Sequence, residues 1–199
     1  MDEAVSLFPL VDPAAATDEL RADVTVVVPT RRLAHHLRAR HDAACLARGL
    51  ATWRTAAVVT WAELIRRLFD ADRASGMQQG RWLDPGHAVV AWETIAGREA
   101  EESGVLAAKG LGARAQRSWN LLHDHQIPLA ALREDASPEV QAFARWCEQY
   151  QRRGRRQGWV DPAEAAACVR PPPSTTMFEL AGFDVLTPLQ QATLLRFAA

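Results

Sequence analysis

Short runs of β-branched and other apolar residues interrupt a chain whose remaining apolar positions mostly follow a helical period. Residues 24–28 read Val-Thr-Val-Val-Val, residues 56–59 form a second apolar run, and residues 175–181 form a third. Continuous apolarity, in place of alternation, is typical of strands buried on both faces of a parallel sheet. A helical period follows each run, so the pattern predicts an α/β fold in which these three strands lie in one parallel sheet.

Threonines stand where the first two predicted strands turn into helices. Thr30 can cap the first helix, and Thr60 with Glu63 three residues later forms the pattern of a capping box. Ligands of open α/β sheets bind at the carboxyl ends of the strands. The pattern therefore places Thr30, Arg31 and Arg32 at a ligand-binding edge, with Thr60 beside them at the end of the second strand.

The middle of the chain, from residue 84 to about 168, shows only helical periods, and no strand-like run occurs between residues 90 and 165. Three prolines at 171–173 then forbid helix. This order predicts a first α/β segment over residues 1–83, an inserted all-helical subdomain over 84–170, and a return to the α/β part over 171–199. The last helix stops without a cap, which leads us to expect a piece of a longer protein.

Composition narrows the functional classes. A net charge of −1 excludes a uniformly basic nucleic-acid-binding surface, so any such surface must be a local patch. Cys45, Cys147 and Cys168 are odd in number and far apart, which favours reduced thiols over a disulfide framework or a zinc site. The chain has no signal-peptide pattern and no run long enough to span a membrane. We therefore expect a cytoplasmic protein without membrane contact.

Four segments, in order, resemble motifs of superfamily 1 helicases of the UvrD/RecB type. Residues 27–38, VVPTRRLAHHLR, and residues 58–69, VVTWAELIRRLF, are similar to two motifs that contact single-stranded DNA in those enzymes. Residues 150–165 are similar to the end of their inserted helical subdomain, and residues 178–194 fall where they carry an Asp-Glu magnesium motif. The resemblance implies a P-loop-NTPase-like parallel sheet with flanking helices and an inserted helical subdomain. It also implies DNA contact through Thr30, Arg31, Arg32, Thr60 and Trp61.

The chain departs from that family where ATP chemistry is concerned. A phosphate loop, G-x-x-x-x-G-K-[ST], should precede the first strong strand, but residues 1–23 contain neither glycine nor lysine. Ala181 and Gly182 stand at the degenerate Walker B-like position, where the family carries the carboxylates that hold magnesium and activate water. We therefore expect no catalytic residue, no metal and no cofactor in this region.

A helicase-like fold without ATPase motifs is similar to the AddB and RecC group of bacterial DNA repair proteins. The resemblance implies a non-catalytic, DNA-guiding or scaffolding region of a double-strand-break repair complex. Its partners would be single-stranded or unwound DNA and a RecB- or AddA-like helicase-nuclease subunit. In that group a second helicase-like domain and a nuclease domain usually follow. Two alternatives stay open: a protein-interaction scaffold without DNA contact, and a diverged ATP-dependent helicase whose P-loop is missing.

Each candidate residue also has a purely structural interpretation. Thr30 can be a helix cap followed by solvated arginines, and Thr60 and Trp61 can be a capping box and a core tryptophan. The basic run at residues 152–156 can contact nucleic acid or a partner, or can be a solvated helix end. The pairs His123 with His125 and His41 with Cys45 lack the further ligands that a metal site needs.

Overall fold

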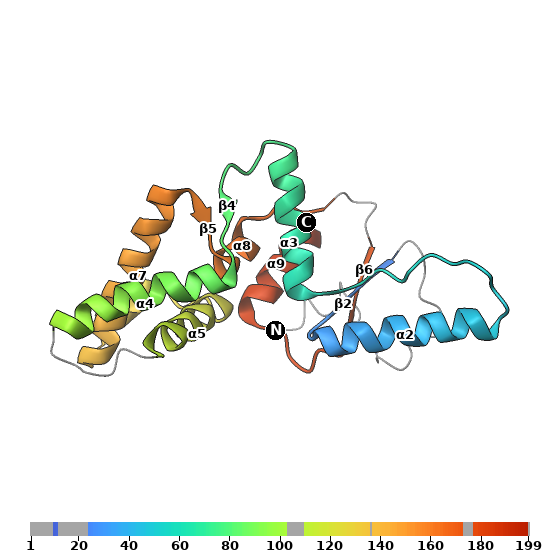
Figure 1. Cartoon of the computed structure of the whole chain (residues 1–199), viewed down its shortest axis with the longest axis horizontal. Coiled ribbons are helices and arrows are strands. Elements are labelled where there is room, and N and C mark those ends of the chain that lie inside the picture. Colours follow the sequence, from blue (N-terminus) through green and yellow to red (C-terminus); the bar gives the residue numbers. More distant parts are fainter. Residues whose placement is uncertain (1–9, 12–23, 103–109, 136, 173–176, 199) are drawn as a thin grey trace. The chain divides into compact units, whose positions relative to one another are not determined.

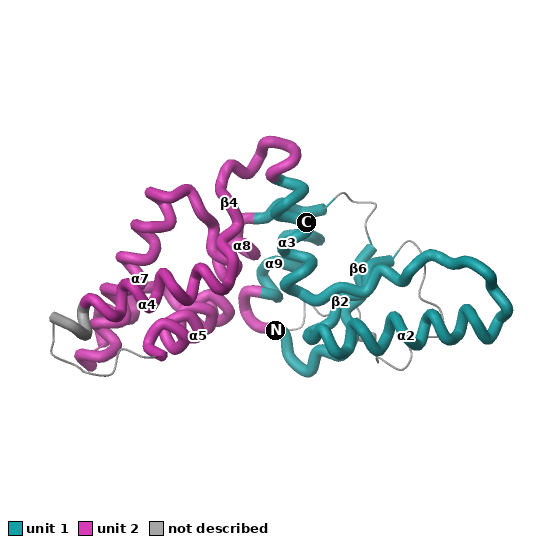
Figure 2. The backbone as a smooth tube through the Cα atoms, viewed as in Figure 1, with its two compact units in different colours: residues 1–72, 169–186, 190–199 teal, residues 73–168, 187–189 magenta. Residues whose placement is uncertain are grey.

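The computed structural model describes residues 10–11, 24–102, 110–135, 137–172 and 177–198. The chain divides into two compact units (Figure 2). An α/β unit comprises residues 1–72, 169–186 and 190–199, and a helical unit comprises residues 73–168 and 187–189. The helical unit therefore begins eleven residues earlier than the predicted boundary at residue 84, because the chain leaves the α/β unit within a helix.

The α/β unit contains a four-stranded parallel sheet (Figure 1). Its strands lie in the order β1 (Leu10–Val11), β6 (Met177–Ala181), β2 (Val24–Val28) and β3 (Val58–Thr60). This confirms that the three predicted strands share one parallel sheet, although β3 begins two residues later than expected. The sequence also suggests a short strand over residues 4–11 and a short helix over residues 14–22; apart from Leu10 and Val11, these residues lie outside the described ones.

The side chains of successive residues of β2 pack in two different hydrophobic clusters. Val26 and Val28 pack with Ala34 and Leu37 of α2 (Arg31–Ala47), whereas Val27 packs in the cluster that contains Leu64 of α3 and Leu194 of α9. The helices α3 (Trp61–Ala74) and α9 (Pro188–Ala198) thus contribute to a different core from α2. Burial on both faces explains why the strand is continuously apolar instead of alternating.

The helical unit consists mainly of helices that pack around aromatic rings. Trp92 stacks on Tyr150 with ring centroids 4.1 Å apart, and Trp119 lies edge-on to Tyr150 at 5.6 Å. A short helix after Pro128 was not predicted, because five residues show too little period to recognise. The helices are α4 (Pro85–Glu102), α5 (Leu111–Asp124), α6 (Leu129–Arg133), α7 (Pro138–Gln157) and α8 (Pro162–Cys168).

The prediction that residues 84–170 are entirely helical is wrong at one point. The two-residue strands β4 (Arg81–Trp82) and β5 (Trp159–Val160) form a small parallel sheet within the helical unit. Gly158, with a φ of 63°, ends α7 and turns the chain so that its carbonyl accepts a 2.7 Å hydrogen bond from the Arg81 N–H. Strands this short leave no alternation in the sequence, so only their pairing reveals them.

A buried polar contact joins α7 to the start of α8. Asp161 is fully buried, its Oδ2 accepts a hydrogen bond from the Tyr150 hydroxyl, and its Oδ1 accepts one from the Ala163 N–H at 2.8 Å. Asp161 therefore caps the start of α8 through the Ala163 N–H and also binds the Tyr150 hydroxyl. None of the helices in the described part of the chain combines the length and the apolarity that a membrane span needs.

Candidate nucleic-acid interface

The carboxyl ends of three neighbouring strands form one edge of the parallel sheet. In the register of the sheet, Val28 of β2 pairs with Thr60 of β3, and Val27 pairs with Leu180 of β6. The segment that follows β2 therefore lies between the ends of β3 and β6. The expectation that the first two strand ends lie together is confirmed.

Thr30 caps the helix that begins at this edge. Its backbone is extended (φ −134°, ψ 148°), and its Oγ1 accepts a 3.2 Å hydrogen bond from the Leu33 N–H. Arg31 and Arg32 occupy the first turn of α2, and both side chains are exposed. The first-turn N–H groups of a helix lack intrahelical acceptors and carry partial positive charge. Two guanidinium groups beside such a terminus suit phosphate or carboxylate oxygens.

Thr60 and Trp61 belong to the framework behind this edge. Thr60 is only 6% exposed and forms a reciprocal capping box with Glu63: its Oγ1 accepts from the Glu63 N–H at 3.2 Å, while its N–H donates to Glu63 Oε2 at 2.8 Å. Trp61 is half-buried and packs against the cluster that contains Val27 and Val59. Of the five predicted contact residues, Thr30, Arg31 and Arg32 are thus the exposed ones.

The Glu63 carboxylate adds a negative charge to this edge. The hydrogen bond from the Thr60 N–H is the main cause that lowers the pKa of Glu63, while partial burial acts in the opposite direction. The positive charges of Arg38 and Arg31 lower the pKa of Glu63 further. Arg38 also donates a hydrogen bond from its Nη2 to the Val58 carbonyl. Glu63 is therefore ionised at neutral pH and partly offsets the charge of Arg31.

A hollow of about 760 Å³ lies between the end of β2 and the loop after β6. Sequence reasoning missed His36, which follows Arg32 by one helical turn, and the loop residue Asp184, whose carboxylate would oppose an anion. Helical spacing would have found His36, whereas nothing local places the loop of β6 beside α2. The lining residues are Pro29, Thr30, Arg32, Leu33, His36, Gly182, Phe183, Asp184 and Val185.

Ala181 and Gly182, the pair that the sequence resemblance places at a degenerate Walker B-like position, lie at the end of β6 beside this hollow. Ala181, the last residue of β6, is fully buried, and Gly182 adopts a φ of 73°, a left-handed conformation that side chains disfavour. Neither residue has a side chain that can ligate a cation or accept a proton. Within the described ranges, no group of three His, Cys, Asp or Glu side chains is arranged to hold a metal ion.

Neither the models of known protein families nor the curated proteins give a match to this chain. The geometry of the edge is therefore the basis for its functional interpretation.

Proposed function

We propose that this chain is the non-catalytic, helicase-like N-terminal region of an AddB-like subunit of a bacterial double-strand-break repair complex. Its α/β unit is a diverged P-loop-NTPase-like core that guides the unwound single strand. A RecB- or AddA-like partner in the cytoplasm supplies the helicase and nuclease chemistry. The region itself does not hydrolyse ATP.

The observation that carries this proposal is the end of β6. The parallel sheet brings Ala181 and Gly182 to the same edge as Thr30. By the sequence resemblance, these two residues replace the two carboxylates that an active helicase needs. Ala181 is buried, and Gly182 has a positive φ, a backbone conformation that side chains disfavour. A truncated or misassigned N-terminus would account for a missing P-loop, but it would not account for this pair. These features favour an inactive relative over a diverged ATP-dependent helicase.

The exposed side chains at the same edge support contact with the DNA backbone. Thr30, Arg31 and Arg32 present a hydroxyl, helix N–H groups and two guanidinium groups, all of which bind phosphate oxygens. Such contacts act on the backbone and carry no base specificity. Any recognition of the bases would fall to the partner subunit or to further domains.

The test is the double change Arg31→Ala and Arg32→Ala in the 199-residue chain. Each lost phosphate contact lowers the single-strand affinity by about fivefold at 0.1 M salt in the counterion-release limit, so we expect about a 25-fold loss. The slope of log K against log salt should flatten by about 1.4. Fluorescence anisotropy with labelled oligonucleotides of several sequences measures both quantities, and the loss should be the same for all of them.

The control removes the same charge from the far end of the same helix. Arg40 is exposed on α2 and Arg48 is exposed at its C-terminal cap, so Arg40→Ala with Arg48→Ala should leave binding within about twofold of the parent. An equal loss in the control would mean that only net charge matters. Unchanged binding in the first variant would favour the protein-interaction scaffold, for which Val185, 80% exposed at the rim of the hollow, offers an apolar contact.

A further inference from the structure

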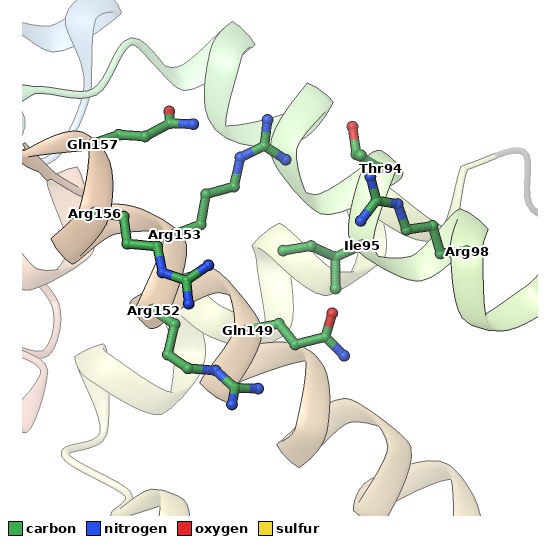
Figure 3. Close-up of a pocket in the computed structure, with 8 residues that line it drawn as sticks. All are labelled: Thr94, Ile95, Arg98, Gln149, Arg152, Arg153, Arg156 and Gln157. Atoms are coloured by element: carbon green, nitrogen blue, oxygen red, sulfur yellow. The ribbon is translucent and has the colours of Figure 1, made fainter.

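A second basic surface lies in the helical unit, in a groove of about 490 Å³ between α4 and α7. In Figure 3 the side chains of Arg98 from α4 and Arg153 from α7 extend toward the same space, with Arg152 and Arg156 along α7 beside them. Thr94 and the glutamines of α7 add neutral polar groups to the lining. Four guanidinium groups thus line one surface depression.

Helical periodicity explains how α7 builds its side of the groove. Gln149, Arg152, Arg153 and Arg156 follow one another at intervals of three, one and three residues, which places them on a single face of the helix. The opposite face, with Cys147, Tyr150 and Gly154, is buried in the core of the unit. The arginines are therefore held in position by the packing of the other face.

Two acidic side chains of these helices, Glu148 and Glu93, make contacts outside the groove. Glu148 pairs with Arg133 through Arg133 Nε at 2.9 Å, and Glu93 packs against Gly112 of α5. Among the residues whose side chains the structure describes, none that lines the groove is acidic. The four positively charged guanidinium groups repel one another, because no carboxylate in the lining neutralises them. A bound anion would relieve that repulsion. The groove is therefore suited to an anionic ligand.

The helix macrodipole accounts for only part of this arrangement. Cations are stabilised within the last turn of a helix, where α7 carries Arg155 and Arg156. Arg98 and Arg152 lie before the last turns of their helices, so the helix dipole does not explain why both line this groove. Their convergence results from the packing of α4 against α7.

Aromatic rings adjoin the arginines. A neighbouring hollow shares Arg153 and Gln157 with the groove and is also lined by Trp82 and Trp159. The Arg153 guanidinium lies over the Trp159 ring, 5.9 Å from its centroid. Asp84 also lines this hollow and adds a negative charge to it, and its Oδ1 lies 3.9 Å from His87 Nδ1. Guanidinium groups next to aromatic rings are typical of surfaces that bind single-stranded nucleic acid.

We propose that the groove lined by Arg98, Arg152, Arg153 and Arg156 binds the phosphate backbone of a single-stranded nucleic acid without reading its bases. Arginine forks hold successive phosphates, and the adjoining tryptophans provide apolar surface for the bases. This site lies in the other compact unit and does not rest on the function proposed for the sheet edge.

The experiment measures binding of fluorescent oligothymidylate to the whole chain and to the variant Arg152→Ala with Arg156→Ala. We expect about a 25-fold loss of affinity at 0.1 M salt and a salt slope flatter by about 1.4, since two phosphate contacts disappear. Repeating both measurements in a chain that also carries Arg31→Ala and Arg32→Ala separates this groove from the sheet edge. In that background, Arg152→Ala with Arg156→Ala should still cause the same loss of affinity.

Arg155 provides a matched control on the same helix. Arg155 does not line the groove. Its charge acts instead on Glu164 of α8, whose pKa is raised mainly by burial and lowered in part by Arg155. Arg155→Ala should change the affinity by less than about twofold, against about fivefold for Arg152→Ala alone. A variant with Arg152→Lys and Arg156→Lys keeps the charge and should recover most of the affinity, which excludes loss of folding as the cause.

Three results would overturn the proposal. The first is parent-like binding by the Arg152→Ala and Arg156→Ala variant. The second is an equal loss in the Arg155→Ala control. The third is displacement of the oligonucleotide by polyglutamate as effectively as by unlabelled oligothymidylate at equal charge, which would mark the groove as a site for an acidic protein segment.

Discussion

The buried pair of Tyr150 and Asp161 allows a quantitative test of how the helical unit is held together. Asp161→Ala removes both carboxylate oxygens, one bonded to the Tyr150 hydroxyl and one to the Ala163 N–H. Tyr150 is only 1% exposed, so water does not replace the lost acceptor at its hydroxyl. The N–H of Ala163 also loses the cap that starts α8.

The expected cost follows from these two bonds. Loss of a hydrogen bond to a buried charged acceptor costs about 1.5–3 kcal/mol. Loss of a helix cap costs about 1 kcal/mol. The negative charge of Asp161 also raises the pKa of Glu164, so its removal relieves a repulsion and reduces the sum. We expect Asp161→Ala to lower the free energy of unfolding by about 3 kcal/mol.

Denaturant unfolding followed by tryptophan fluorescence measures this change. Trp92, Trp119 and Trp159 all have their ring centroids within 6 Å of that of Tyr150, so their emission reports on this core. Asp161→Asn keeps an oxygen for the Ala163 N–H and should cost about 1 kcal/mol, the scale of one hydrogen bond.

A double-mutant cycle with Tyr150→Phe isolates the side-chain bond. The coupling free energy between Asp161→Ala and Tyr150→Phe should be about 1.5–3 kcal/mol. Asp70, whose ion pair with Arg66 is half exposed, provides a control, and Asp70→Ala should cost less than about 0.5 kcal/mol. A cost below about 1 kcal/mol for Asp161→Ala, or a coupling near zero, would refute the reasoning.

Two further predictions concern a glycine and a carboxylate. A Cβ at Gly154 would lie 2.4 Å from Trp159 Nε1, so Gly154→Ala should destabilise the helical unit, whereas Gly97→Ala, in open space on α4, should stabilise it by about 0.5–1 kcal/mol. Thermal unfolding compares the two, and a stabilised Gly154→Ala variant would contradict the clash. The pKa of Glu63 is below its ordinary value of 4.5 in the folded chain, so its contribution to stability is present above pH 4.5 and is lost as the pH falls further. Denaturant unfolding at pH 7 and pH 3.5 measures this loss, and the free energy of unfolding should fall less between the two pH values for Glu63→Gln than for the parent. An equal fall would mean that the capping box does not cause the acid-induced loss of stability.

Much of the α/β unit follows from local patterns. The run at residues 24–28 predicts its own strand because burial on both faces requires an uninterrupted apolar sequence. Thr60 and Glu63 predict their capping box because the two partners are three residues apart in the chain. The candidate edge also follows, since the carboxyl ends of parallel strands lie together. The sequence did not reveal that Thr60 is buried and that Arg31 shares this edge with Glu63.

Contacts between distant segments were beyond the sequence. The carboxylate of Asp72 accepts hydrogen bonds from the Nε and the backbone N–H of Arg170 at 2.7 and 3.0 Å. The two residues are 98 positions apart and lie near the points where the chain leaves the α/β unit and returns to it. β4 and β5 pair through two residues each. A single sequence contains no period that links such positions.

The sequence by itself determined the strands of the four-stranded sheet after residue 24, the longer helices, and the helix caps at Thr30 and Thr60. It also showed that residues 1–23 contain neither the glycines nor the lysine of a phosphate loop. These properties depend on a residue and its neighbours within about one helical turn. Only the tertiary structure decided that Arg98 of α4 and Arg152 of α7 line the same groove, and that Thr30, Gly182 and Asp184 line one hollow. The physical reason is that a helix or strand specifies its own buried face, whereas the partner of that face depends on how the whole chain packs.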